Sequence, residues 1–395
     1  MTDFYIKKLK DLWHFLKKLL NRFDLFQIIP MLVLATVGIA FVYSTGQQVG
    51  GHAAHSFWVK QLVWFAAGAG MWVLLASMDY RNFKYFAVPI YILSIVALLA
   101  IFFVGVKVYG ATRWLQIGGM RIQPSEFGKF AVVIMLATIV SMRNFDINSL
   151  WGITLFGSAA FFPFLLILKE PDLGSALVII PIAAAIAFVS KLRFKLIITA
   201  IVLGAICFTV EVINEKNAYY PLLKGYQKER ILVFLDPDRD RKDRGWNQLQ
   251  SELAVGSGGL FGKGYMQGTQ NTLGFLPQTV SNTDFIFSVI AEETGFAGSL
   301  LVILMYMMLV AAALRTAFLA RDRFGQYIAA GIAAAIFFHT VVNIGMSIRV
   351  MPVTGLPLPL ISYGGSFMLS TMIYLGVLQS VYARRRRPFS EMEEA

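Results

Sequence analysis

The chain has 395 residues, of which 57% are hydrophobic and only 15% are charged. Soluble domains usually carry about 25% charged residues, so this composition excludes an ordinary soluble protein. The apolar residues fall in runs of roughly 20, the length that crosses a hydrocarbon core of about 30 Å. The alternating strands of a membrane barrel are absent from the sequence. We therefore predict an all-α integral membrane protein.

The first 24 residues precede the first apolar run and form a basic amphipathic pattern. Apolar side chains fall on one helical face between Leu9 and Phe23, and lysines occupy the remainder. Such a helix is expected to lie along an anionic membrane surface. The single cysteine, Cys207, lies in a later apolar run, so no disulfide within the chain is possible.

The apolar runs predict about ten transmembrane helices, near residues 25–45, 57–77, 85–105, 123–142, 151–168, 174–190, 194–214, 284–314, 326–346 and 361–382. The expected division of the chain is a cytoplasmic N-terminal segment (1–24), helices one to seven (25–214), a long extracytoplasmic loop (215–283), helices eight to ten (284–383) and a cytoplasmic tail (384–395).

The distribution of the net charge of +12 predicts which side each loop faces. An even number of spans places both termini on one side, and that side would hold nineteen basic residues. The short loops of the other side would hold five, namely Lys107, Arg113, Arg121, Lys169 and Arg349. By the positive-inside rule, both termini are expected in the cytoplasm and the long loop outside. The charge therefore reflects topology and does not indicate a nucleic-acid partner.

The long loop contains an amphipathic stretch (Tyr226 to Leu235) and a Gly-rich segment, Gly256-Ser-Gly-Gly-Leu-Phe-Gly-Lys-Gly264. The latter is not a Walker loop, because Ser257 replaces the first glycine and Gly264 replaces the final Ser or Thr. Two interpretations stay open. The glycines form either a flexible re-entrant turn or a nest of backbone N–H groups for a phosphate.

Charged residues inside or beside apolar runs need an explanation, since each costs about 2.5–3.5 kcal/mol on insertion scales. Glu126 and Lys129 lie three residues apart on one helical face. They are either a self-neutralising pair or part of a polar cavity wall. Upstream, Trp114 is typical of a membrane-interface anchor. Its neighbour Arg113 carries a fork of donors that suits a lipid pyrophosphate.

Two carboxylates are expected at helix starts. In Lys169-Glu-Pro-Asp-Leu-Gly174, the proline ends one helix and Asp172 can cap the next. Thr283 is expected to cap the eighth span, which places Asp284 in its first turn. Asp284 is then either a carboxylate that stabilises the helix through the helix dipole or a reactive carboxylate at the outer membrane edge. Ser288 and Glu292 follow it on the same helical face.

Metal-ligand spacing of His and Cys is absent from the sequence. Any bound cation would therefore be an oxygen-bound Mg²⁺ or Mn²⁺.

These segments resemble, in order along the chain, the diagnostic segments of the SEDS (shape, elongation, division and sporulation) family. The stretch from Asn343 through Met351-Pro-Val-Thr-Gly-Leu-Pro-Leu-Pro-Leu-Ile-Ser-Tyr-Gly-Gly-Ser366 is similar to the family signature. The Gly-rich segment resembles the RodA (elongation) branch more than the FtsW (division) branch. Two positions depart from the family pattern: Arg349 replaces a small residue, usually glycine, and Asn282 replaces a common histidine.

The resemblance implies a ten-span fold and a peptidoglycan glycosyltransferase of the bacterial cytoplasmic membrane. Such an enzyme polymerises lipid II into β-1,4 glycan strands outside the membrane and releases undecaprenyl pyrophosphate. The resemblance places the family's essential aspartate at Asp284, as base or metal ligand. It places the candidate substrate-cavity residues at Arg113, Glu126, Lys129, Asp172, Lys263 and Ser362.

The partner implied by the resemblance is a class B penicillin-binding protein, a transpeptidase, within the elongation complex that controls cell shape. Two other functions stay open. A flippase for lipid-linked precursors would also use charges inside the membrane and broken helices. A non-enzymatic scaffold of the elongation complex would not need Asp284.

Overall fold

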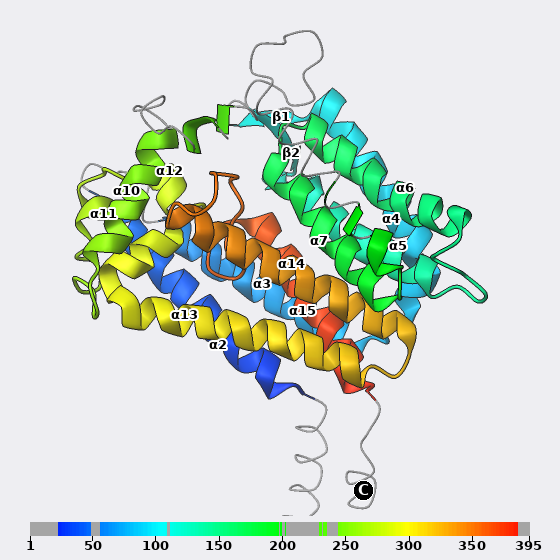
Figure 1. Cartoon of the computed structure of the whole chain (residues 1–395). Coiled ribbons are helices and arrows are strands. Elements are labelled where there is room, and N and C mark those ends of the chain that lie inside the picture. The colour runs from blue at the N-terminus through cyan, green and yellow to red at the C-terminus, as the bar shows by residue number, and fades with distance from the viewer. Residues whose placement is uncertain are drawn as a thin grey trace, which may run out of the picture.

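The computed structural model describes residues 23–48, 56–108, 111–196 and 244–385, together with 198–199, 202, 229–230 and 232–234. Its long helices form a bundle (Figure 1), and they are α2 (Leu25–Thr45), α3 (Phe57–Ser77), α4 (Asn82–Val104), α5 (Pro124–Val140), α6 (Leu150–Lys169), α7 (Leu173–Val189), α13 (Ile286–Leu319), α14 (Arg323–Ser347) and α15 (Gly365–Ala383). The apolar runs become helices because a helix satisfies every backbone polar group within its own segment, as lipid requires.

Seven of these helices are long and apolar enough to cross a membrane: α2, α3, α4, α6, α13, α14 and α15. Helices α5 and α7 are shorter, at 17 residues each, and pack within the same bundle. The first two predicted spans match α2 and α3 at both ends. The expected span 194–214 lies mostly outside the described residues, as does the amphipathic N-terminal segment. The chain is therefore a multi-pass helical membrane protein, as predicted.

The centre of the bundle is formed by α5, α14 and α15, most of whose side chains are buried. Helix α15 packs against α3, and α14 packs against both α13 and α7. Helices α3 and α4, by contrast, expose most of their side chains. An exposed apolar helix face is expected where lipid replaces a protein neighbour.

The start of α2 and the end of α15 lie at the same end of the bundle (Figure 1). Asp24, which caps α2, accepts a hydrogen bond from Arg315 near the end of α13 at 3.1 Å. The Arg315 guanidinium also donates to the Tyr382 hydroxyl at the end of α15. This end of the bundle therefore holds both ends of the described chain.

Two parts of the fold were not predicted. A three-stranded antiparallel sheet, β1 (Val106–Val108), β2 (Ala111–Ile117) and β3 (Met120–Ile122), connects α4 to α5. The expected long loop contains helix α10 (Arg244–Ser257) and the short helices α11 (Thr269–Thr272) and α12 (Gln278–Ser281). These three helices gather at the end of the bundle away from the start of α2 (Figure 1).

The Gly-rich segment forms backbone hydrogen bonds to α13 around a break in that helix. Gly295 interrupts that helix with a left-handed φ of +68°. The backbone groups released there pair with the Gly-rich turn, because Phe296 N donates to the Gly259 carbonyl and Lys263 N donates to the Glu292 carbonyl. The Gly264 amide likewise donates a hydrogen bond to the Glu293 carbonyl. The turn is therefore a fixed clamp, and its occupied amides do not fit the phosphate-nest interpretation.

Candidate functional site

Asp284 lies in the turn between α12 and α13, ahead of the first helical residue. The N-cap of α13 is Phe285, and the cap makes no side-chain hydrogen bond. The expectation that Thr283 caps this helix is therefore wrong, and its hydroxyl donates instead to the Thr279 carbonyl. Asp284 therefore precedes the first turn of α13, whereas the sequence had predicted it within that turn.

The Asp284 carboxylate and the Arg230 guanidinium both lie beside the backbone of Gly355, which has no side chain. A Cβ added to Gly355 would lie 3.4 Å from Asp284 Oδ2 and 3.9 Å from Arg230 Nη2, so both groups border this glycine. The Arg230 guanidinium also donates to the Thr354 carbonyl at 2.5 Å. Arg230 belongs to the amphipathic stretch noted in the sequence, where it follows Lys228 and Glu229 and no pattern distinguished it from them.

Burial raises the pKa of Asp284 above its ordinary value. The guanidinium groups of Arg230 and Arg113 oppose this shift, and the Asp172 carboxylate adds to it. These four side chains come from four segments: the Asp284 turn, the 229–234 segment, β2 and the turn before α7. Two cations and two anions thus meet at the end of the bundle where α13 begins.

Asp172 caps α7 and also binds side chains of this site. Its Oδ1 accepts from the Ser175 amide at 3.2 Å and lies 3.8 Å from Arg113 Nη1. Its Oδ2 accepts from Gln123 Nε2 at 3.0 Å. The Arg113 guanidinium also donates to the Pro171 carbonyl. Asp172 therefore caps α7, as expected, and also contacts Arg113 and Gln123.

Glu170 is a buried carboxyl beside this pair. It is 1% exposed, and neither of its oxygens has a hydrogen-bond partner among the described residues. Burial raises its pKa to about 9, with a further contribution from Asp172 and an opposing one from Arg113. The side chain is therefore neutral at pH 7. The sequence shows that Glu170 stands in the turn between two predicted helices, but only the tertiary structure shows that its side chain is buried.

Glu126 and Lys129 form a buried ion pair inside the bundle. Their N···O distance is 2.9 Å, and both side chains are at most 3% exposed. Lys129 Nζ also lies 3.2 Å from His339 Nε2, whose ring contacts the Pro357 carbonyl through Nδ1 at 3.2 Å. The self-neutralising interpretation is confirmed. The pair reaches the Asp284 region only indirectly, through His339 and the segment that follows α14.

Two predicted cavity residues, Lys263 and Ser362, make hydrogen bonds to groups other than the side chains around Asp284. Lys263 donates to Glu292 Oε1 at 2.6 Å and to Thr269 at 2.8 Å, within the Gly-rich clamp. Glu292 therefore belongs to the clamp and does not share a site with Asp284, although both fall on one face of the sequence pattern. Ser362 is 1% exposed and donates to the Thr283 carbonyl at 2.5 Å. Ser362 thus holds the turn that carries Asp284 from a buried position.

The departure at Arg349 has a local explanation. Its φ is +56°, in the left-handed region that favours glycine. Its guanidinium lies 3.2 Å from a carboxylate oxygen of Glu252 in α10, so the side chain gains an ion pair at the exposed edge of the structure. Within the described part of the chain, Arg349 therefore ties α10 to the end of α14.

No group of three or more His, Cys, Asp or Glu side chains placed to hold a metal ion occurs among the described residues. The site does offer two carboxylates, Asp284 and Asp172. Mg²⁺ is commonly bound by one or two carboxylates together with substrate phosphates, so this donor set fits such an ion when a phosphorylated substrate is bound.

Fold and site together define a multi-pass helical membrane protein with paired arginine and aspartate side chains at one end of its bundle. The chain belongs to the FtsW/RodA/SpoVE family, whose model, described as a cell cycle protein, matches residues 23–387.

Several known proteins are similar to this chain over most of its length. A peptidoglycan glycosyltransferase RodA of Treponema pallidum is 32% identical, covering 92% of this chain and 98% of its own length. The peptidoglycan glycosyltransferase MrdB of Escherichia coli K12 is 34% identical, with 91% and 93% covered.

Solved structures resemble this fold closely. A chain from a peptidoglycan synthase complex, described as coordinating polymerization and crosslinking, superposes with a TM-score of 0.76 at 28% identity, covering 93% of this chain and 99% of its own. The rod shape determining protein RodA of Thermus thermophilus superposes with a TM-score of 0.67 at 25% identity, with 93% and 98% covered. The predicted fold class is confirmed.

Proposed function

We propose that this protein is a peptidoglycan glycosyltransferase that polymerises lipid II into β-1,4 glycan strands for cell elongation. The observation that carries the proposal is the Asp284 carboxylate beside the Arg230 and Arg113 guanidinium groups in a member of this family. The similar proteins of Treponema and Escherichia bear that activity in their names.

In the proposed reaction, the 4-hydroxyl of the GlcNAc in lipid II attacks the anomeric carbon of the terminal MurNAc of the growing chain. The new O4–C1 bond forms as the bond from C1 to the phosphate oxygen breaks, with inversion at C1. Asp284 accepts the hydroxyl proton, a step typically worth about 10²–10⁴ in rate. A raised pKa suits this role, because a base acts best when its pKa approaches the working pH.

The leaving undecaprenyl pyrophosphate gains negative charge, and cationic donors stabilise it in the transition state. Arg113 and Arg230 are the candidates, since a planar guanidinium can bind phosphate oxygens through two parallel hydrogen bonds. A divalent cation bound by Asp284 and Asp172 would supply further neutralisation of the pyrophosphate. Asp172 and Gln123 hold the Arg113 side of the site in place through the contacts described above.

The decisive experiment is polymerisation of labelled lipid II by purified protein, with Asp284→Asn as the test variant. An amide keeps the size of the side chain but cannot act as a base, so we expect polymer formation to fall at least about 10²-fold. Asp146→Asn is the matched control, because Asp146 lies in the α5–α6 turn at the other end of the bundle. Near-normal glycan synthesis by Asp284→Asn would refute the assignment.

The same preparation distinguishes the alternative functions. A flippase would move lipid II across a vesicle bilayer without making polymer, and a scaffold would do neither. Chelation followed by return of Mg²⁺ or Mn²⁺ tests the cation. If chelation left the polymerisation rate unchanged, the reaction would not require a divalent cation.

We further propose that both termini are cytoplasmic and that α10 to α12 lie outside the bacterial cytoplasmic membrane. The charge asymmetry of the loops supports this orientation. In a Cys207→Ala background, a cysteine at the exposed Leu273 should react with an impermeant thiol reagent in intact spheroplasts. A cysteine at the exposed Met142 should react only after lysis. The reverse pattern would invert the orientation and exclude an external Asp284.

The proposed partner is a class B penicillin-binding protein. Its support is the superposition on a chain from a synthase complex that coordinates polymerization and crosslinking. Co-purification of the two proteins from detergent extracts, and stimulation of polymer synthesis on mixing, would test it. Full activity with no stimulation and no co-purification would count against this partner.

A further inference from the structure

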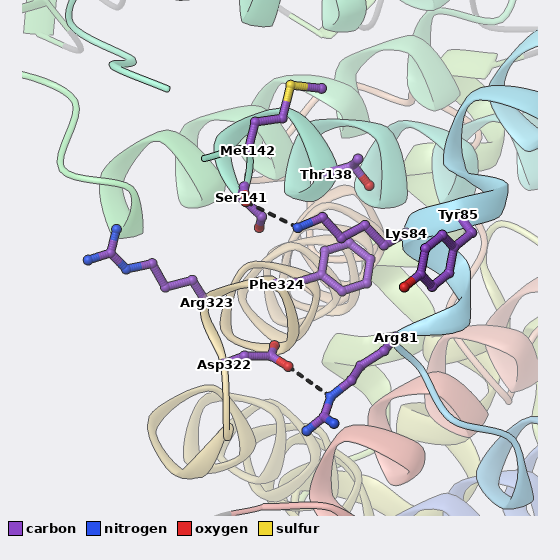
Figure 2. Close-up of a pocket in the computed structure, with 9 residues that line it drawn as sticks. All are labelled: Arg81, Lys84, Tyr85, Thr138, Ser141, Met142, Asp322, Arg323 and Phe324. Atoms are coloured by element: carbon purple, nitrogen blue, oxygen red, sulfur yellow. Dashed lines mark hydrogen bonds and ion pairs between the residues drawn. The ribbon is translucent and has the colours of Figure 1, made fainter. Parts of the chain in front are cut away.

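Figure 2 shows the residues that line a hollow of about 600 Å³. The hollow lies where α13 ends and α14 begins, whereas Asp284 precedes the other end of α13. The start of α4, the end of α5 and the start of α14 surround it. Its lining includes three basic side chains, Arg81, Lys84 and Arg323, and one carboxylate, Asp322. None of these residues belongs to the proposed catalytic site.

The single carboxylate of the hollow is already engaged. Asp322 accepts hydrogen bonds from Arg81 Nε at 3.1 Å and from the Tyr80 hydroxyl at 2.8 Å. Its other oxygen caps α14 by accepting from the Gly325 amide at 2.8 Å. Asp322 and Arg81 therefore neutralise each other, and the charges of Lys84 and Arg323 remain.

Those two cations have free donors to offer. Both side chains are exposed, and Lys84 donates to the Ser141 carbonyl at 3.2 Å, which engages one of its three hydrogens. Arg323 makes no ion pair with any of the described residues. Helices α4 and α14 also begin here, and the positive ends of their dipoles favour a nearby anion. The hollow is thus suited to an anion.

The surroundings of the hollow are apolar. Tyr85 and Met142 line the hollow and are 82% and 44% exposed, and Phe86, which follows Tyr85 in α4, is 59% exposed. A soluble anion gains nothing from such a surface, whereas acyl chains bury it. The ligand that matches both features carries an anionic group and a hydrocarbon tail.

The hydroxyl groups of the lining indicate the rest of the headgroup. Thr138 and Ser141 line the hollow, and each donates its hydroxyl hydrogen to a carbonyl of α5, at 2.8 and 2.6 Å. Each hydroxyl oxygen therefore has only its lone pairs left for a ligand and would act as an acceptor. Acceptors beside cations suit a phosphodiester that carries hydroxyl donors, such as a glycerol headgroup.

We propose that this hollow binds the headgroup of an anionic glycerophospholipid, with its phosphate held by Lys84 and Arg323 and its acyl chains along α4. Basic pockets between transmembrane helices on the cytoplasmic side are a recognised mode of anionic lipid binding. The site adds a lipid ligand that is neither substrate nor product of the proposed reaction.

The test is retention of phosphatidylglycerol by the full-length protein, measured by native mass spectrometry after titration in mixed micelles. Phosphatidylcholine, which has a phosphate but no net charge, serves as the comparison lipid. We expect the double variant Lys84→Gln/Arg323→Gln to lose roughly tenfold or more in apparent affinity for phosphatidylglycerol. Both side chains are exposed, so the variant should fold, and a monodisperse elution profile with unchanged lipid II polymerisation would verify this.

The matched control is Arg143→Gln/Arg193→Gln, which removes the same charge from exposed residues of the same end but outside the hollow. It should retain the lipid within about twofold of wild type. Equal losses in the two double variants would show a diffuse surface effect and overturn the site. Equal retention of the two lipids would also overturn it. If inorganic phosphate displaced the lipid as effectively as added phosphatidylglycerol, the ligand would be a free phosphate and the lipid assignment would be wrong.

Discussion

The side-chain amide of Asn343 donates one hydrogen bond to the main-chain carbonyl of Asp284, at 2.9 Å, and another to the Leu356 carbonyl, at 2.8 Å. One buried amide group thus joins α14, the turn that carries the proposed base, and the segment that borders it at Gly355. His339 lies one helical turn earlier and contacts the same segment at Pro357. The Asp284 turn is therefore held from α14 as well as from the segment around Ser362.

Asn343→Ala should reduce polymer synthesis by about tenfold or more while leaving Asp284 chemically intact. The variant leaves two carbonyl groups without a donor, at about 1–3 kcal/mol for each buried unsatisfied group, and frees the Asp284 turn. The rate is measured with labelled lipid II. Thr340→Ala is the control, because Thr340 is a buried residue of the same helix and, among the described residues, its hydroxyl bonds only to the Ile336 carbonyl. Equal losses in both variants would indicate general damage to α14.

Glu126 and Lys129 should show strong energetic coupling. Removing one partner leaves an uncompensated charge inside the bundle, which typically costs about 3–5 kcal/mol, whereas removing both leaves none. We expect Lys129→Met and Glu126→Gln each to lower the melting temperature in detergent more than the double variant does. A double variant less stable than the two single effects combined would disprove the coupling.

Glu170 should make stability depend on pH in a specific direction. Its pKa is about 9 in the folded protein against 4.5 as a free side chain, so between these values the folded state binds more protons than the unfolded state. The contribution of Glu170 to stability is then fully present below about pH 4.5 and is lost as pH rises toward 9. Glu170→Gln, which mimics the neutral acid, should remove this slope and keep activity within about twofold at pH 7.

The measurement is the melting temperature across that pH range for wild type and Glu170→Gln. Glu252→Gln is the control, because Glu252 is a partly exposed carboxylate in an ion pair with Arg349. An identical slope in wild type and Glu170→Gln would mean that Glu170 ionises normally.

Gly295→Ala should weaken the clamp between α13 and the Gly-rich segment. Its left-handed φ disfavours any other residue by roughly 1–2 kcal/mol, and an added Cβ would lie 2.3 Å from the Gly262 amide nitrogen. We expect a lower melting temperature and a lower yield of monodisperse protein. Gly70→Ala inside α3 is the control, since a Cβ there meets nothing within 4 Å. A Gly295→Ala protein as stable as this control would contradict the role of the break.

Much of the architecture followed from local sequence. The ends of α2 and α3 were predicted to the residue, because a run of apolar side chains in lipid has one outcome that satisfies its backbone. The Glu126–Lys129 pair was also predicted, since three residues of helix place both side chains on one face. The motifs in the sequence also indicated the family that the match over residues 23–387 then showed.

Other features depended on segments far apart in the chain. The clamp at Gly295 depends on residues more than 30 positions earlier, and the three-stranded sheet is too short for its pattern to stand out. The helix-capping role expected of Thr283 failed because α13 begins two residues beyond Asp284, at Ile286, after a turn held by Ser362 from near the end of the chain.

The sequence by itself determined that this protein is a helical membrane protein, where most of its long helices lie, and which carboxylates need an explanation, because hydropathy and helical period act over a few turns. Only the tertiary structure decided which of those charges meet. It brings Arg230, Arg113, Asp172 and Asp284 together while directing Lys263 and Glu292 elsewhere. Electrostatic interactions depend on distance in space and on burial, and neither is set by spacing along the chain.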